Sequence, residues 1–312
     1  MDQLLSIGSA ALKKAALDER AKEFLLGNDV LFNVLKKAAD RYIGGETMGE
    51  TIAKVIQQNQ QGFKCSIEFM GESTRNEQEA IQATNEFIKI AQEISQQNLY
   101  STLSLDLSHI GLAVSEDLCF ENLMAICSQA ALHATEVIIS AEGTDRTDAI
   151  IKTYKRAVKE YANVGITLQA YLYRSKDDFA ELLKEPGRIR IVKGAFETEP
   201  HLSMPRGEQL DEVYLDYVAQ LLSEGHLCSI ATHHDKIQQR AKELIHQYNP
   251  DKGCYEFESL YGIQTTQLEK LKEEGYPTKL YFVYGKEWYL YLCNRLAEYP
   301  LNIFQALSDV VS

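Results

Sequence analysis

Two polar segments in the second half of the chain contain residue types that bind and activate ligands. Gln169 begins Gln-Ala-Tyr-Leu, and Arg190 begins Arg-Ile-Val-Lys-Gly-Ala, which includes Lys193 and the small pair Gly194–Ala195. Arginine and lysine donate charge-assisted hydrogen bonds, and glycine lets a ligand approach the backbone closely. A third polar segment contains Thr232 and His233. Together these segments predict a pocket for a large anionic, heteroaromatic cofactor.

Eight short apolar runs, which alternate with segments of helical periodicity, position these residues. The runs are Cys65–Phe69, Thr102–Leu105, Glu136–Ser140, Ile166–Ala170, Arg190–Lys193, Leu227–Ala231, Cys254–Glu258 and Lys279–Val283. Eight strand–helix alternations predict an α/β fold, a TIM-like (β/α)8 barrel. In such a barrel the ends of the fourth, fifth and sixth runs meet at the catalytic face. An open doubly wound sheet is the competing arrangement, but the GxGxxG turn typical of it is absent.

The first 60 residues differ from the rest in having only helical periodicity. The residues at helical spacing in this part are Leu25, Leu26, Val30, Leu31, Val34 and Leu35, and the break Gly44-Gly45 follows them. The sequence therefore predicts an N-terminal helical arm at residues 1–60 and a barrel at residues 61–312. Helical periodicity does not specify whether this arm covers the barrel or mediates self-association, and the oligomeric state stays open.

Charge and hydropathy favour an acidic enzyme that works in the cytoplasm. The formal net charge is -13, which disfavours nucleic acid and anionic membrane surfaces as partners. The N-terminus lacks a basic region followed by an apolar core, and no run approaches transmembrane length. We therefore expect a cytoplasmic protein with no integral membrane segment and a small-molecule substrate.

The cysteines and histidines do not predict a metal site. The six cysteines are scattered without CxxC spacing, which favours reduced, buried thiols. His233 and His234 are adjacent, so on a strand they would point to opposite faces.

The alternation of side chains along the strands predicts which residues face the barrel interior. In the second run the leucines would pack against helices, so that Ser104 and Asp106 point inward. The same parity turns Ser140 and Tyr281 inward. We expect these residues to converge with Gln169 and Arg190 on one cavity.

Five segments of the chain resemble the proline dehydrogenase family, in the family's order and spacing. They begin at Gln169 (Gln-Ala-Tyr-Leu-Tyr-Arg-Ser), Arg190 (Arg-Ile-Val-Lys-Gly-Ala-Phe), Ala231 (Ala-Thr-His-His-Asp-Lys), Phe257 (Phe-Glu-Ser-Leu-Tyr-Gly) and Tyr284 (Tyr-Gly-Lys-Glu-Trp-Tyr). The resemblance extends from the first strand to the closing helix and is strongest to the stand-alone bacterial enzymes. It implies a distorted (β/α)8 barrel with non-covalently bound FAD, which oxidises proline to pyrroline-5-carboxylate by hydride transfer to the flavin.

The resemblance also implies roles for the cofactor-side residues. Arg190 is similar to the arginine beside the flavin N5, where it would stabilise the charge gained on reduction. Gln169 is similar to the residue that hydrogen-bonds the isoalloxazine ring. The other implied cofactor contacts are Lys193, Gly194, Ala195, Thr232, His233 and Glu258, the last of which replaces a family glutamine. A Schiff-base role for Lys193 is the weaker alternative.

The substrate side departs from the family pattern. Asp106 stands at the place of an inward lysine, Ser140 at that of an aspartate, and Asn294 at that of the first of two paired arginines. Arg295 remains as the second arginine and would face Asp106 as an ion-pair partner. Leu260, Tyr281 and Glu298 match retained pocket positions.

These changes favour a flavoenzyme that oxidises a C–N bond of a cyclic or secondary amine or amino acid other than free L-proline. Lysine to aspartate removes two positive units, arginine to asparagine removes one and aspartate to serine restores one, so the pocket is about two units more negative. Two alternatives stay open: a genuine proline dehydrogenase whose clamp is rebuilt around Arg295, and a non-catalytic barrel that acts as a binding subunit. The sequence leaves open which electron acceptor reoxidises the flavin.

Overall fold

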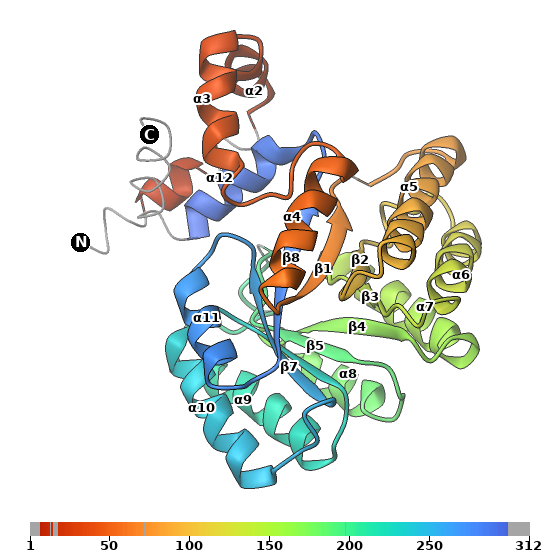
Figure 1. The fold of residues 1–312 in the computed structure, drawn as a ribbon, viewed down its shortest axis with the longest axis vertical. Coiled ribbons are helices and arrows are strands. Elements are labelled where there is room, and N and C mark those ends of the chain that lie inside the picture. The colour runs from red at the N-terminus through yellow and green to blue at the C-terminus, as the bar shows by residue number, and fades with distance from the viewer. Residues whose placement is uncertain (1–6, 13, 15–17, 72, 197, 299–312) are drawn as a thin grey trace.

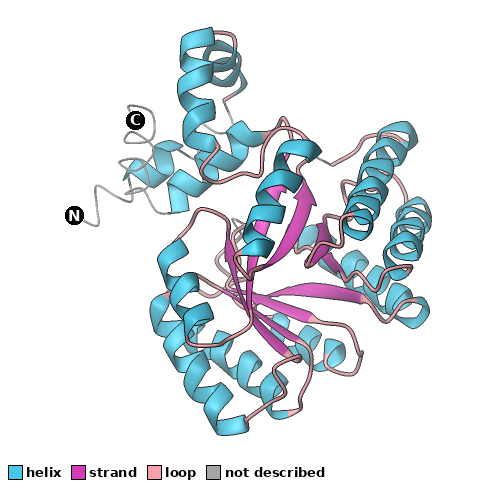
Figure 2. Ribbon diagram, in the orientation of Figure 1, coloured by secondary structure: helices cyan, strands magenta, loops and turns pink. Residues whose placement is uncertain are grey.

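The computed structural model describes residues 7–12, 14, 18–71, 73–196 and 198–298. Eight parallel strands close into a barrel in chain order (Figures 1 and 2). They are β1 (Lys64–Phe69), β2 (Ser101–Leu105), β3 (Val137–Ile139), β4 (Val164–Gln169), β5 (Ile189–Val192), β6 (Cys228–Ala231), β7 (Tyr255–Leu260) and β8 (Thr278–Tyr284). The predicted (β/α)8 barrel is confirmed, and each predicted run falls on one strand with ends that differ by no more than two residues.

Helices cover the outside of the barrel, and their apolar faces supply its outer core. The helices after the first seven strands are α5 (Glu77–Gln96), α6 (Glu116–Ala131), α7 (Thr147–Glu160), α8 (Ser175–Leu182), α9 (Glu208–Ser223), α10 (Asp235–Tyr248) and α11 (Thr265–Glu273), with the 3-10 turn η1 (Thr144–Arg146) before α7. Phe87 of α5, Leu123 of α6 and Val218 of α9 are fully buried against the strands. Buried apolar residues that recur at helical spacing pack against the strands and hold each helix on the sheet.

Helix α4 (Met48–Gln60) precedes β1 and packs on the barrel beside β1 and β8 (Figure 1). Its start is defined by a capping box, in which the Thr47 side chain accepts from the Glu50 backbone and the Glu50 side chain accepts from the Thr47 backbone. Ile52 and Val55 belong to the same buried core as β1. The predicted arm at residues 1–60 thus includes a helix that covers the barrel, and the division of the chain at residue 60 remains a proposal.

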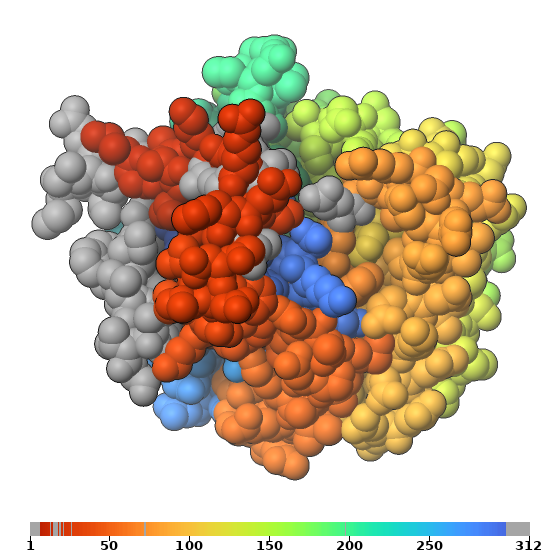
Figure 3. Space-filling model, turned by 90° about the horizontal axis from the view of Figure 1, so that it is seen from above, coloured from red at the N-terminus to blue at the C-terminus, as the bar shows by residue number. Residues whose placement is uncertain are grey.

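The helix after β8, α12 (Trp288–Glu298), packs against α3 (Asp29–Ala39) in a second hydrophobic cluster. Phe32 meets Trp288 edge to face with ring centroids 5.5 Å apart, and the Trp288 indole donates to Glu46 at 2.7 Å. Helix α2 (Glu19–Leu26) lies beside α3, and Figure 3 shows the red N-terminal helices against the blue C-terminal segment. This cluster places α12 at one end of the barrel, where its residues reach the ends of β7 and β8.

The barrel interior is charged, whereas aliphatic layers are usual in this fold. Near the N-terminal ends of the strands, Lys64 pairs with Glu136 at 2.8 Å and with Glu256 at 3.1 Å. Arg188 pairs with Glu136 at 2.8 Å, and the fully buried Lys279 pairs with Glu256 at 2.6 Å. Each buried charge in this layer has an opposite charge within 4 Å, which offsets the cost of removing it from water.

The cysteines are free thiols, as the sequence predicted. All six cysteines are free, and five are buried. Burial raises the pKa of the Cys65 and Cys228 thiols to about 12, which keeps them protonated and unreactive. None of the helices in the described ranges has the length and apolarity to cross a membrane, and those ranges contain no group of three metal-ligand side chains. The cytoplasmic location remains a prediction.

Candidate active site

The Arg190 side chain lies inside the barrel and donates hydrogen bonds to residues from several strands. Its Nε donates to Thr167 at 2.8 Å, Nη1 donates to Ser104 at 3.1 Å and to Glu258 at 3.2 Å, and Nη2 donates to Ser140 at 3.1 Å. The guanidinium also lies over the Tyr281 ring, 5.0 Å from its centroid. A guanidinium has five N–H donors, so one hydrogen on Nη2 has no acceptor among the described residues. This remaining hydrogen is on Nη2, the same nitrogen that donates to Ser140. Ser140 follows β3, at the C-terminal mouth of the barrel.

The carboxylate of Glu68, on β1, connects β1 to the end of β3 and to β8 through hydrogen bonds. It accepts from Ser140 at 3.0 Å and also from the Tyr281 hydroxyl. Desolvation raises the pKa of Glu68, and the hydrogen bonds from Tyr281 and Ser140 oppose that rise. The predicted inward orientation of Ser140 and Tyr281 brings both side chains to this carboxylate.

Asp106 lies at the mouth at the end of β2, near two other acids. Glu142 accepts from the Ser108 backbone N–H at 3.0 Å and from Arg146 at 2.9 Å. The Asp106 carboxyl forms no hydrogen bond or ion pair with the part of the chain that the structure describes. Desolvation, followed by the charges of Glu68 and Glu142, raises the pKa of Asp106 well above its usual range.

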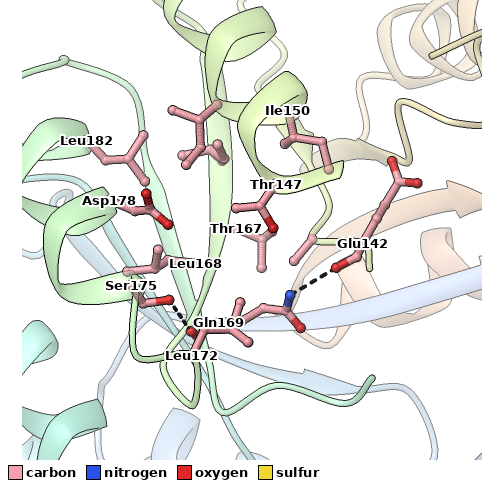
Figure 4. A pocket seen from close by; sticks show the side chains of 13 residues that line it. Glu142, Thr147, Ile150, Thr167, Leu168, Gln169, Leu172, Ser175, Asp178 and Leu182 are labelled. Carbon is pink, nitrogen blue, oxygen red and sulfur yellow. Dashed lines mark hydrogen bonds between the residues drawn. The ribbon is translucent and has the colours of Figure 1, made fainter. Parts of the chain in front are cut away.

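Gln169 ends β4 and is buried beside a small cavity (Figure 4). Its amide nitrogen donates to the backbone oxygen of Glu142 at 3.0 Å, and its own backbone oxygen accepts from Ser175 at 2.6 Å. The cavity holds about 30 Å³ between β4, α7 and α8, room for about one water molecule. The cavity itself is therefore too small for a flavin ring, and Gln169 would meet a cofactor from the barrel mouth.

The segment after β5 turns sharply beside an aromatic ring. Gly194 has φ +114°, and a Cβ at this position would lie 2.2 Å from the Tyr171 ring, so only glycine fits. Lys193 pairs with Asp211 of α9 at 2.5 Å and with the His234 ring at 3.2 Å. Ala195 is exposed beyond this turn.

His233, at the end of β6, is buried in the electrostatic field of nearby cations. Burial, followed by the charges of Arg295, Arg206 and Lys193, lowers the pKa of His233 to about 4. A neutral imidazole in the field of these cations indicates a region of positive potential that suits a phosphate group. Thr232 shapes the same strand end, because its hydroxyl accepts from the His234 backbone at 3.1 Å.

Arg206 is a site residue that the sequence did not predict. It lies in the loop between β5 and α9, 12 residues after Gly194, and its Nη2 donates to the Gly194 backbone oxygen at 2.8 Å. The only feature of the sequence that could have indicated Arg206 is that it is an arginine in the loop after Lys-Gly-Ala. The path of that loop brings it back to the strand end.

The other residues predicted to bind the substrate, besides Asp106 and Ser140, lie on β7, β8 and α12. Leu260 and Tyr281, at the ends of β7 and β8, pack against the cluster that contains α12. Asn294 and Arg295 lie on α12, and the Arg295 guanidinium sits over the Tyr291 ring at 4.9 Å. Within the described ranges no ion pair joins Arg295 to Asp106, contrary to that expectation. The side chain of Glu298 is outside the described residues.

Glu258 is buried below the mouth and bridges two cations. Its Oε1 accepts from Arg190, and its Oε2 lies 2.8 Å from the Nζ of Lys279. The structure therefore connects Arg190 to the charged layer at the bottom of the barrel. The family's glutamine at this position would have no charge to offer either cation.

A second hollow lies away from these residues. It measures about 460 Å³ and is bounded by α3, α4, the loop before α11, and β8. Its lining includes Lys37, Arg41, Gln58 and Tyr261, and none of the predicted site residues. The residues predicted for binding and catalysis therefore do not line this hollow.

The fold and these strand ends define a (β/α)8-barrel enzyme with an arginine-centred site on its C-terminal face. The proline dehydrogenase family model matches residues 51–300. The chain is 34% identical over 266 residues to proline dehydrogenase 2 of Bacillus subtilis strain 168, covering 85% of this chain and 88% of the relative. It is 29% identical over 297 residues to proline dehydrogenase of Deinococcus radiodurans, covering 93% and 94%.

Solved structures show the same fold at lower identity. Proline utilization A from Bdellovibrio bacteriovorus, inactivated by N-propargylglycine, superposes with a TM-score of 0.80 at 18% identity, over 93% of this chain and 38% of that chain. Proline utilization A from Corynebacterium freiburgense gives a TM-score of 0.72 at 18% identity, over 94% and 34%. This chain thus spans well under half the length of those proteins. It belongs to the proline dehydrogenase family, whose members are flavoprotein oxidoreductases.

Proposed function

We propose that this chain is an FAD-dependent proline dehydrogenase that oxidises L-proline to pyrroline-5-carboxylate. The observation that carries the proposal is the position of Arg190, fixed by four hydrogen bonds with one Nη2 hydrogen left for a ligand at the mouth. The relatives named proline dehydrogenase support the same reaction, and they favour L-proline over the altered substrate expected from the sequence.

The donor set at the mouth fits FAD. The cations Lys193 and Arg206 near His233 suit the pyrophosphate, and Arg190 suits the electron-rich edge of the flavin ring. FAD, when bound, supplies the acceptor for the hydride. Thr232, Gly194 and Ala195 would line the cofactor along the ends of β5 and β6.

The chemistry requires loss of a hydride and a proton from the substrate. In the substrate, a C–H bond next to nitrogen and an N–H bond would break and a C=N bond would form; bound FAD would supply the acceptor for the hydride, and the proton would be released to solvent. Arg190 would stabilise the negative charge that this transfer creates. Glu68, which already accepts hydrogen bonds from Ser140 and Tyr281, is an acidic group that interacts electrostatically with Arg190.

The structure weakens the charge argument for an altered substrate. That argument counted Asp106 as a full negative charge, but desolvation and two neighbouring acids raise its pKa well above the usual range. A raised pKa reduces the negative charge that Asp106 carries at a given pH, and its protonated form offers an O–H donor to a carboxylate. Arg295, above the barrel on α12, supplies the cation of the carboxylate clamp.

A second substrate class remains supported by one observation. Asp106 has no hydrogen-bond or ion-pair partner among the described residues, and it takes the place of the family's lysine. A substrate with an added cationic group, or one without a carboxylate, would complement an ionised Asp106. If charge at the mouth excludes proline, combining Asp106→Lys, Ser140→Asp and Asn294→Arg should introduce proline-dependent flavin reduction.

Steady-state kinetics with an artificial dye as electron acceptor separates these substrates. We expect a higher kcat/KM for L-proline than for pyrrolidine, which has the same ring without the carboxylate. A higher value for pyrrolidine would contradict the proposal and favour the second substrate class. A protein that binds no FAD and oxidises neither compound would support a non-catalytic binding subunit.

A further inference from the structure

We propose that Glu258 lowers the reduction potential of the bound flavin through its ion pair with Arg190. The inference rests on the proposed function, because it requires FAD beside Arg190. It concerns a residue of this chain that departs from the family's glutamine. Glu258 is thus a positioning residue that acts through Arg190.

The contacts of Glu258 are those of a buried carboxylate that bridges two cations. The two oxygens divide between two cations, with Oε1 3.2 Å from Arg190 Nη1 and Oε2 2.8 Å from Lys279 Nζ. Glu258 is 3% exposed and Lys279 is 0% exposed. The carboxylate and Lys279 are thus almost completely removed from water, so bulk solvent screens this bridge weakly.

A carboxylate in this position opposes the effect of Arg190 on the flavin. Arg190 favours the reduced flavin because its positive charge offsets the negative charge gained on reduction. A negative charge 3.2 Å from the same guanidinium cancels part of that potential, and the buried setting screens it weakly. A neutral side chain of the same shape would leave more positive potential at the ring and make reduction easier.

Glu256 provides a matched control inside the same network. It lies two residues earlier on the same face of β7, and it also pairs with Lys279, at 2.6 Å. Its other ion pair within 3.5 Å is with Lys64, at 3.1 Å, in the layer near the N-terminal ends of the strands. Glu256 makes no contact with Arg190, so its charge is more remote from the mouth.

The test is a spectroelectrochemical titration of the FAD-loaded protein and its variants without substrate. Glu258→Gln should favour the reduced flavin at least tenfold, which is a rise of about 30 mV for a two-electron couple. Glu256→Gln should change the same equilibrium by less than threefold. Glu258→Asp keeps the charge and should remain within threefold of the unmodified protein.

Three outcomes would overturn the inference. An unchanged potential in Glu258→Gln, with FAD bound, would show that its charge does not reach the flavin. An equal shift in Glu258→Asp would assign the effect to packing. A protein without a flavin spectrum before the titration would overturn this inference together with the proposed function, and that spectrum distinguishes the two failures.

Discussion

The hydroxyl oxygen of Ser140 lies 3.1 Å from Nη2 of Arg190, and through it the central guanidinium connects to the acids at the mouth. The same hydroxyl donates to Glu68 at 3.0 Å. Ser140 therefore orients the Arg190 donor group that bears the remaining hydrogen. In the family pattern an aspartate stands here, which would accept from Arg190 but repel Glu68.

Ser140→Ala tests this connection. It leaves one buried Arg190 N–H without an acceptor and removes one of the two hydrogen bonds to the Glu68 carboxylate, so we expect a loss of about 1–3 kcal/mol in the free energy of unfolding. Flavin reduction by substrate should slow by about tenfold, because the orientation of Arg190 is lost. Ser101→Ala is the matched control, since the buried Ser101 hydroxyl has no hydrogen-bond partner. Equal effects of the two changes, measured by urea unfolding and stopped-flow absorbance, would contradict this role.

Arg206→Gln should weaken FAD binding by about 10- to 100-fold. The change removes one of the cations near His233 and one charge-assisted contact, typically worth about 1.5–3 kcal/mol. Arg240→Gln is the control, because Arg240 pairs with Glu212 on the outer helices. Titration of the apoprotein with FAD, followed by flavin fluorescence, measures both. Unchanged affinity in Arg206→Gln would place the pyrophosphate elsewhere.

Asp106→Asn should stabilise the protein at neutral pH. The pKa of Asp106 is higher in the folded protein than in the unfolded chain, so the folded state binds more protons between these two values. Its stability is therefore greatest below the unfolded pKa of about 3.9 and falls as the pH rises toward the folded pKa. We expect Asp106→Asn to gain at least about 1 kcal/mol at pH 7 and to show no such gain at pH 4.

Urea unfolding at both pH values measures this difference. Asp177→Asn, a change at an exposed position in the first turn of α8, should show no comparable pH-dependent gain. The quantity to compare is the gain in the free energy of unfolding that Asp106→Asn gives over the unmodified protein. If this gain is no larger at pH 7 than at pH 4, Asp106 is ionised at the mouth. That result would restore the charge argument against L-proline.

Lys279→Met should destabilise the fold strongly. Lys279 is fully buried between Glu256 and Glu258, at 2.6 and 2.8 Å, and its removal leaves two carboxylates with less compensation. Breaking a buried pair in this way costs about 3–5 kcal/mol. Adding Glu256→Gln to the variant should recover part of the loss in urea unfolding. No recovery would assign the loss to packing of the lysine stem.

The strands and their inward residues were predictable because both depend on local patterns. Alternation along β2 and β8 turned Ser104 and Tyr281 inward without reference to any other element. The position of Arg206 was not predictable, because a long loop returns it to Gly194. The raised pKa of Asp106 depends on its desolvation and on Glu68 and Glu142, which come from other strand ends, so a charge count along the sequence did not include this effect. The expected pairing of Arg295 with Asp106 failed for the same reason, since helical spacing on α12 does not determine how that helix sits over the barrel.

The most direct test of the account is the visible spectrum of the purified protein before and after anaerobic addition of L-proline. Bound flavin reports both the cofactor and the reaction in one sample. The account predicts a yellow protein whose flavin absorbance bleaches when L-proline is added. A yellow protein that does not bleach with L-proline would contradict the proposed substrate, and a colourless protein that cannot be reconstituted with FAD would contradict the flavin site itself.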